Sequence, residues 1–236
     1  MSNQRRLHLP AVGTLFLLSG AAGLIFEVAW LRRMSFVFGA TSQATATVLA
    51  AFMGGLALGS WLLGRAADRM KKPLRFYALL QLGVGVAGLL VPLLLALFQH
   101  LYVPLYSATG GGGFLFLTVR ALLALLTLLP ATTLMGATLP ALARHVAAEK
   151  TSLGGRVGLL YALNTLGAVA GTLLSGFVLI EHLGLWGSSL LAAGLNLAAA
   201  GAALLLSRGE DVAVRPVERF KAPREKKARL LLILYA

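Results

Sequence analysis

Six long apolar segments constrain this chain more than any other feature. A transmembrane helix needs about 20 consecutive, predominantly apolar residues. Six segments meet that requirement, and they run approximately over Ala11–Leu31, Ala44–Leu63, Leu74–Phe98, Phe114–Leu139, Val157–Ile180 and Leu185–Leu206. The composition agrees, because 58% of the 236 residues are hydrophobic and only 12% are charged, whereas a soluble domain has about 25% charged residues. The sequence therefore predicts an all-α integral membrane protein with six transmembrane helices.

The chain divides after the sixth apolar segment. We expect a six-helix membrane domain over 1–207 and a basic cytoplasmic linker over 208–229. A further apolar run begins at Leu230 and is cut off by the C-terminus, so residues 230–236 read as the start of a seventh transmembrane helix. On this expectation the chain is the first half of a longer architecture.

The basic residues predict the orientation in the membrane. Two precede the first segment, five separate the second from the third, three separate the fourth from the fifth and eight follow the sixth, which makes 18 of the 21 Lys and Arg residues. The opposite side has Arg32 and Arg33, and Arg120 lies inside the fourth segment. Because positively charged loops stay in the cytoplasm, we expect a multi-pass membrane protein with both termini cytoplasmic. The net charge of +13 then calls for anionic lipid at the basic tail, and nucleic acid is not an expected partner.

The sequence offers little for catalysis or metal binding. There is no Cys, and the 4 His residues are scattered without metal-ligand spacing. The acids that follow the sixth segment lie in a short linker without a strand pattern. We therefore expect no catalytic residue, no metal and no cofactor, and we do not expect this chain to be an enzyme.

Glu27 is the one acid well inside a predicted span. An intramembrane carboxylate is costly and points by default to a functional site with a partner. Arg120 lies at a similar depth in the fourth span, so we predict a buried Glu27–Arg120 pair, with Arg32 and Arg33 as competing partners near the outer interface. A clamp between helices is the favoured interpretation, and a proton or solute site is the alternative. Asn164 in the fifth span is a candidate cavity residue, although an interhelical hydrogen bond is the simpler explanation.

Glycines at four-residue spacing predict close helix contacts. Gly55 and Gly59 share one face of the second span, and Gly167 and Gly171 share one face of the fifth. Small residues at this spacing let transmembrane helices approach each other closely. Tight bundle packing is the favoured interpretation, and an interface that moves during transport is the alternative.

Three motifs resemble those of the major facilitator superfamily. The loop GRAADRMKK after the second span resembles that superfamily's cytoplasmic gating loop, with matching residues at Gly64, Asp68, Arg69 and Lys72. Lys71 and Pro73 depart from its pattern. Arg120 is similar to the superfamily's fourth-helix arginine. The fifth span resembles its fifth-helix glycine motif at four positions, which are Gly158, Gly167, Gly171 and Gly176.

Four longer stretches resemble bacterial membrane-embedded spermidine-synthase-like proteins. They are FLLSGAAGLIFEVAWLRRMSFVFG (Phe16–Gly39), TVLAAFMGGLALGSWLLGRAADR (Thr47–Arg69), LLPATTLMGATLPALAR (Leu128–Arg144) and RVGLLYALNTLGAVAGTLLSGFVLI (Arg156–Ile180). The resemblance implies a facilitator-like membrane region that is fused, in those proteins, to a C-terminal aminopropyltransferase domain. It also implies a location in the bacterial cytoplasmic (inner) membrane. No residue of this chain matches the catalytic positions of that domain.

Two functions follow from the resemblance. The first is a half-transporter for polyamine or another small solute, which would need a second six-helix half, a homodimer or a larger membrane complex. The alternative is an anchor or structural subunit that holds an aminopropyltransferase or another partner at the cytoplasmic face.

Overall fold

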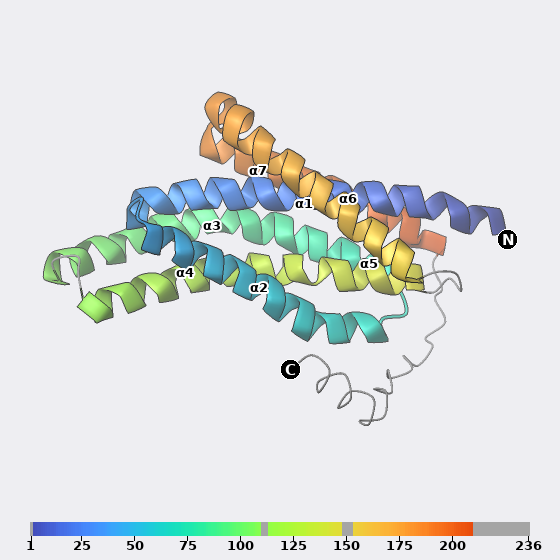
Figure 1. Cartoon of the computed structure of the whole chain (residues 1–236), viewed down its shortest axis with the longest axis horizontal. Coiled ribbons are helices and arrows are strands. Elements are labelled where there is room, and N and C mark those ends of the chain that lie inside the picture. The colour runs from blue at the N-terminus through green and yellow to red at the C-terminus, as the bar shows by residue number, and fades with distance from the viewer. Residues whose placement is uncertain (1, 110–112, 148–152, 210–236) are drawn as a thin grey trace, which may run out of the picture.

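The computed structural model describes residues 2–109, 113–147 and 153–209. These residues are almost entirely helical (Figure 1). In chain order the elements are α1 (Ser2–Phe38), α2 (Ser42–Arg69), α3 (Pro73–Thr109), α4 (Gly113–Gly136), α5 (Thr138–Ala147), α6 (Leu153–Leu174), the π-helix η1 (Ser175–Leu179), α7 (Ile180–Leu206) and the 3₁₀-helix η2 (Ser207–Gly209). Most of the predicted basic linker and the predicted start of a seventh helix lie outside the described residues.

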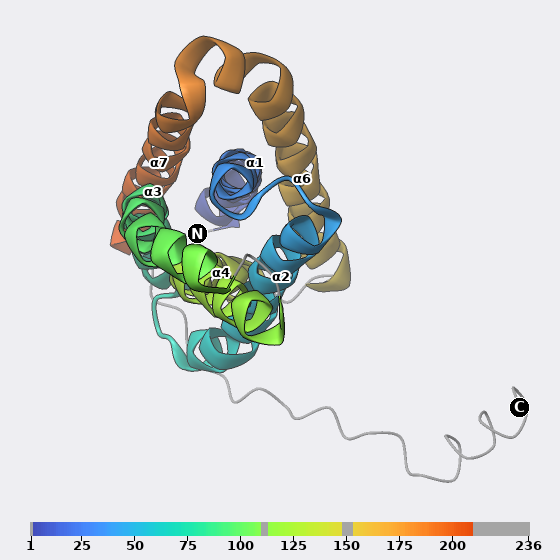
Figure 2. The same ribbon diagram turned by 90° about the vertical axis from the view of Figure 1, so that its left-hand side faces the viewer.

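Five helical segments of the described chain are long and apolar enough to cross a membrane. They cover Leu9–Val37, Ser42–Arg69, Pro73–Phe98, Gly113–Ala147 and Gly154–Leu206. The last segment has 53 residues, and as one straight helix it would extend about 80 Å, far beyond the roughly 30 Å of a bilayer core. It doubles back between α6 and α7, whose axes run in opposite directions (Figures 1 and 2).

The reversal between α6 and α7 is made by a π-helix and a glycine. The last turn before the reversal is the π-helix Ser175–Leu179, and Gly184 has a φ of 68°. This left-handed backbone conformation is readily adopted by glycine, because glycine has no Cβ atom. Regular helix resumes at Leu185, where the sequence predicts that the sixth span begins.

The fourth predicted span is broken at Ala137. Helix α4 ends at Gly136 and α5 begins at Thr138. Between them, the Ala137 N–H donates a hydrogen bond of 3.2 Å to the carbonyl of Leu134, three residues earlier. Pro140 explains the position of the break, because proline lacks an N–H and its ring clashes with the carbonyl four residues earlier, here that of Gly136. Pro130, in contrast, lies inside α4 without ending it.

The helices form an arc around α1. The main packed interfaces join α2 to α4, α4 to α3, α3 to α7, α7 to α1 and α1 to α6. Smaller contacts join α1 to α2 and α5 to α6. Among the described residues no comparable interface joins α2 to α6, which are the two ends of the arc and lie on the same side of α1 (Figure 2). We call this side the α2–α6 edge.

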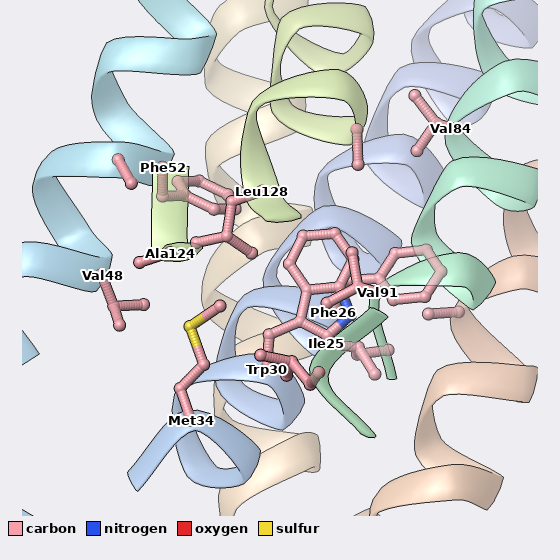
Figure 3. Packing of buried hydrophobic residues seen from close by; sticks show 14 of the residues in the cluster. Ile25, Phe26, Trp30, Met34, Val48, Phe52, Val84, Val91, Ala124 and Leu128 are labelled. Atoms are coloured by element: carbon pink, nitrogen blue, oxygen red, sulfur yellow. The ribbon is translucent and has the colours of Figure 1, made fainter. Parts of the chain in front are cut away.

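Two apolar clusters fill the bundle. One holds Ile25, Phe26, Trp30 and Met34 of α1 with residues of α2, α3, α4 and α7 (Figure 3). The rings of Phe26 and Trp30 are stacked, with centroids 4.9 Å apart. The other cluster lies nearer the N-terminus of α1 and includes residues of α2, α3, α5, α6 and α7. Both clusters draw on α1, which is therefore the central helix of the fold.

Candidate functional site

Two parallel helix pairs hold the bundle together at glycines. On the α1–α6 pair, a methyl group at Gly167 would overlap the Leu17 carbonyl, and one at Gly171 would overlap Ala21. Contact positions therefore advance together along the two helices, so the pair is parallel. Gly167 and Gly171, the two glycines that the spacing singled out, both lie close to the backbone of α1 at this interface.

The α2–α4 pair repeats the same arrangement. A methyl group at Gly55 would overlap Thr132, and one at Gly59 would overlap the Thr133 carbonyl. On the partner helix, one at Gly136 would overlap the Leu56 carbonyl. This pair is parallel too, and Gly55 and Gly59 both lie close to α4.

The other two glycines of the fifth-span motif behave differently. Gly158 and Gly176 are exposed, and nothing lies within 4 Å of the position that a Cβ atom would take at either residue. They do not pack against the described helices of this chain. Their predicted role in helix packing stays a prediction that concerns another chain.

Glu27 lies on the side of α1 that faces the α2–α6 edge. Four residues before it, a Cβ atom at Gly23 would lie 4.0 Å from Met135 Sδ of α4. Seven residues before it, a Cβ atom at Gly20 would overlap Asn164 of α6. Residues four and seven positions apart share a helix face, so Glu27 points between α4 and α6. Its side chain is half-buried and forms no ion pair with any residue that the structure describes.

The structure does not bring Glu27 and Arg120 together. Arg120 is buried in α4, with 5% exposure. Because α1 and α4 are antiparallel (Figure 1) and Gly23 lies level with Met135, the helical rise of 1.5 Å per residue separates Glu27 from Arg120 by about 16 Å along the helix axes. Extended side chains do not bridge that distance. The Glu27–Arg120 pair stays a prediction, and in this conformation the two charges are separate.

Asn164 lies against the backbone of α1. Its Oδ1 atom is 2.9 Å from the place that a Cβ atom would take at Gly20. The side chain is half-buried and lies at the margin of the core. Its contact at Gly20 lies two helical turns before Glu27 along α1. Gly20, Glu27 and Asn164 therefore belong to one wall, formed by α1 and α6, beside the α2–α6 edge.

The predicted gating loop lies at the end of α2. Gly64 is buried, and a Cβ atom there would lie 3.5 Å from Pro140 of α5. Asp68 and Arg69 are exposed in the last turn of α2, and Lys72 follows in the connection to α3. Gly64 thus contributes to packing, whereas a gating role for these residues stays a prediction.

A buried polar network joins α1 to α3. The Tyr77 hydroxyl donates to the Leu15 carbonyl at 3.1 Å, and Gln81 Nε2 donates to the Tyr77 hydroxyl oxygen at 2.6 Å. Tyr77 and Gln81 are fully buried. The available signal was the spacing, because the two residues lie four positions apart on an apolar helix. The network ties the central helix to α3.

No group of three or more His, Cys, Asp or Glu side chains that could hold a metal ion occurs in the part of the chain that the structure describes. Two side chains near the α2–α6 edge, the Glu27 carboxylate and the Asn164 amide, offer oxygen acceptors, and such oxygens suit an ammonium group.

One curated relative matches most of the chain. Over 203 residues, which are 84% of this chain, the sequence is 30% identical to Polyamine aminopropyltransferase 2 of Streptomyces coelicolor. The match covers 35% of that protein, so this chain spans about a third of the length of its relative. No protein-family profile matches the chain. No solved structure matches it either. The chain is thus a helical, apolar protein with long membrane-spanning helices that is similar to part of a polyamine aminopropyltransferase.

Proposed function

We propose that this chain is one six-helix half of a carrier in the bacterial cytoplasmic membrane and that it handles polyamine or another small cationic solute. In this proposal α4 and α5 form one span, and α6 and α7 form two. Both termini lie in the cytoplasm. The chain carries no catalytic residue of its own.

The contact pattern of the helices supports a carrier-type fold. The first three spans (α1, α2, α3) can be exchanged in chain order with the last three (α4–α5, α6, α7), so that α1 takes the place of α4, α2 that of α6, and α3 that of α7. The α1–α6 interface then becomes α4–α2, α1–α7 becomes α4–α3, and α3–α7 maps onto itself. All five main interfaces are reproduced. Three spans repeated in inverted orientation are the building plan of each half of a facilitator-type transporter.

The repeat extends to single glycine contacts. In the α1–α6 pair, Leu17 and Gly20 contact Gly167 and Asn164, and three residues separate each pair along its own helix. In the α4–α2 pair the equivalent residues have the same spacing and contact each other in the same order; they are Thr133, Gly136, Gly59 and Leu56. This residue-level agreement is the observation that carries the proposal.

The charge near the α2–α6 edge supports a cationic solute. Glu27 and Asn164 offer oxygen acceptors on the wall of α1 and α6. A membrane-embedded carboxylate that faces a bundle opening marks a solute or proton pathway. Polyamine is the solute of choice because the relative's name refers to polyamine.

The decisive experiment is spermidine binding and uptake by the full chain reconstituted in liposomes, with its native partners if these co-purify. Glu27→Gln should abolish saturable spermidine binding. Glu181→Gln is the matched control, because Glu181 is an exposed acid at the α6–α7 reversal and its loss should leave binding unchanged. Equal binding by wild type and Glu27→Gln would refute the proposed site, and absence of binding and uptake by the complete assembly would refute the carrier.

The relative's name also supports a second function. This chain matches 35% of a protein called an aminopropyltransferase, so the matched region can serve as the membrane part that holds an aminopropyltransferase at the cytoplasmic face. Exposed basic residues at the end of α2 suit that location, since Arg65 lies 4.6 Å over the exposed Trp61 ring, an arrangement typical of the membrane interface. Co-purification of an aminopropyltransferase, together with absence of spermidine uptake, would favour this anchor.

A further inference from the structure

The reversal between α6 and α7 contains a buried hydroxyl group without a partner. Ser175 is the first residue of the π-helix and is fully buried, and its Oγ atom has no hydrogen-bond partner among the residues that the structure describes. Other hydroxyl groups on α6 and α7 donate to the carbonyl four residues earlier in their own helix; they are Thr165, Thr172, Ser188 and Ser189. A buried polar group without a hydrogen bond costs free energy. Ser175 therefore needs a partner outside its own helix.

The buried face of this helix directs Ser175 towards α1. Ser175 is the buried residue of the π-helix, and the π-helix packs against α1. It lies 11 residues after Asn164, which is close to three helical turns, so both residues belong to one face. Asn164 contacts Gly20, and Gly20 shares a face of α1 with Glu27. The face of Ser175 therefore meets the face of Glu27.

Two helix contacts give the level of this serine along α1. They are the contact of Gly171 with Ala21 and the contact of Asn164 with Gly20. Counted along the parallel helices, the serine is level with a point two residues before Glu27 from the first contact and four residues beyond it from the second. These offsets are about 3 and 6 Å along the helix axis. A glutamate and a serine side chain together span such distances.

Glu27 is the matching group on α1. Its side chain is half-buried, lies inside a membrane span and forms no ion pair with the described residues. Ionisable side chains in transmembrane segments pair with other polar groups. A carboxylate is an acceptor, whereas a hydroxyl group is a donor. The π-helix adds an independent indication, because π turns within α-helices occur frequently at functional sites.

We propose that Ser175 is a second member of the Glu27 site and donates a hydrogen bond to the Glu27 carboxylate. In the membrane the Glu27 side chain adopts the rotamer that reaches the hydroxyl group, which no ion pair prevents. The bond stabilises and orients one carboxylate oxygen and leaves the other for the ammonium group of a solute. Ser175 is thus a positioning residue. The proposal rests on the proposed function only for the solute that this site binds.

Spermidine binding by the full chain in liposomes tests the contribution of the hydroxyl group. Ser175→Ala removes it with little change in volume and should weaken binding about 10- to 100-fold, the worth of a hydrogen bond to a charged group. Ser189→Ala is the matched control, because Ser189 is also buried but its hydroxyl group donates to the Leu185 carbonyl. Its spermidine affinity should equal that of the wild type. Equal affinities of wild type and Ser175→Ala, or equal losses in both serine variants, would overturn the proposal.

Infrared spectroscopy of the full chain in membranes tests the contact itself without a solute. The carboxyl band of Glu27 is the band that disappears in Glu27→Gln, and its frequency reports hydrogen bonding to the carboxyl group. Ser175→Ala should shift this band, whereas Ser189→Ala should leave it in place. An unchanged band in Ser175→Ala would overturn the proposal even if that variant binds spermidine weakly, because the loss would then be structural. If the wild type binds no spermidine, the proposed function fails, and the band alone decides whether the contact exists.

Discussion

The glycine contacts that define the repeat allow a quantitative prediction. Gly59→Ala on α2 and Gly167→Ala on α6 each place a methyl group against a backbone carbonyl of the neighbouring helix, of Thr133 and of Leu17 respectively. Overpacking costs about 1–3 kcal/mol, and the upper end applies because a backbone cannot rotate away as a side chain can. Alanine returns up to about 1 kcal/mol through its better helix propensity. Each variant should therefore lose about 2 kcal/mol of unfolding free energy.

Gly194→Ala is the matched control for this prediction. Gly194 lies in α7, it is exposed, and nothing lies within 4 Å of its Cβ position. The substitution should be neutral or stabilise the protein by up to about 1 kcal/mol. Unfolding of the purified protein by SDS in mixed micelles, followed by Trp fluorescence, measures all three variants on one scale.

The double variant tests whether the two contacts are separate. Gly59→Ala and Gly167→Ala alter different helix pairs, so their losses should add within about 0.5 kcal/mol. If Gly59→Ala or Gly167→Ala matches or exceeds the stability of the wild type, the close backbone approach and the repeat inferred from it are wrong. A loss of equal size in Gly194→Ala would also refute the reasoning, because it would trace the effect to glycine removal itself.

Three further predictions concern other parts of the molecule. Tyr77→Phe removes the bond to the Leu15 carbonyl and should lower the unfolding free energy by about 0.5–1.5 kcal/mol; an unchanged value would mean that the bond contributes nothing. Glu27→Gln and Arg120→Gln should be additive in a double-mutant cycle, because the two charges are separate here; coupling above about 0.5 kcal/mol would reveal a conformation in which they pair. A reporter that works only outside the cytoplasm should be active when it is inserted after Gly113, and a reporter that works only inside should be active when it is fused at the C-terminus. The opposite pattern would reverse the topology.

The sequence was sufficient to predict where helices lie along the chain but not which helices pack against each other. The predicted apolar segments lie in helical chain, and five helical segments of the described residues are long and apolar enough to cross a membrane. Gly55, Gly59, Gly167 and Gly171, which the four-residue spacing singled out, lie close to neighbouring helices. The break at Ala137 also has a local cause in Pro140. These features depend on length, apolarity and backbone chemistry, which can be read along the chain.

Features that depend on the third dimension were out of reach. Gly158 and Gly167 belong to the same glycine motif, yet Gly158 lies on the outer surface and Gly167 contacts α1. Which face of a helix is covered depends on the neighbouring helix, and the sequence does not identify that neighbour. The hydrogen bond from Tyr77 to the Leu15 carbonyl likewise joins residues 62 positions apart. The relative depth of Glu27 and Arg120 also depends on how α1 and α4 are aligned, which span boundaries along the chain do not determine.

The central place of α1 has a consequence for how this protein is made. Helix α1 leaves the ribosome before its main partners α6 and α7 are synthesised. Leu17 and Gly167 are 150 positions apart, and at about 5–20 residues per second their contact has to wait about 8–30 s. During that interval Glu27 and the glycine face of α1 have no final partner in the bilayer. We therefore expect assembly of the nascent chain to benefit from an insertion factor that shields α1 until its partner helices arrive.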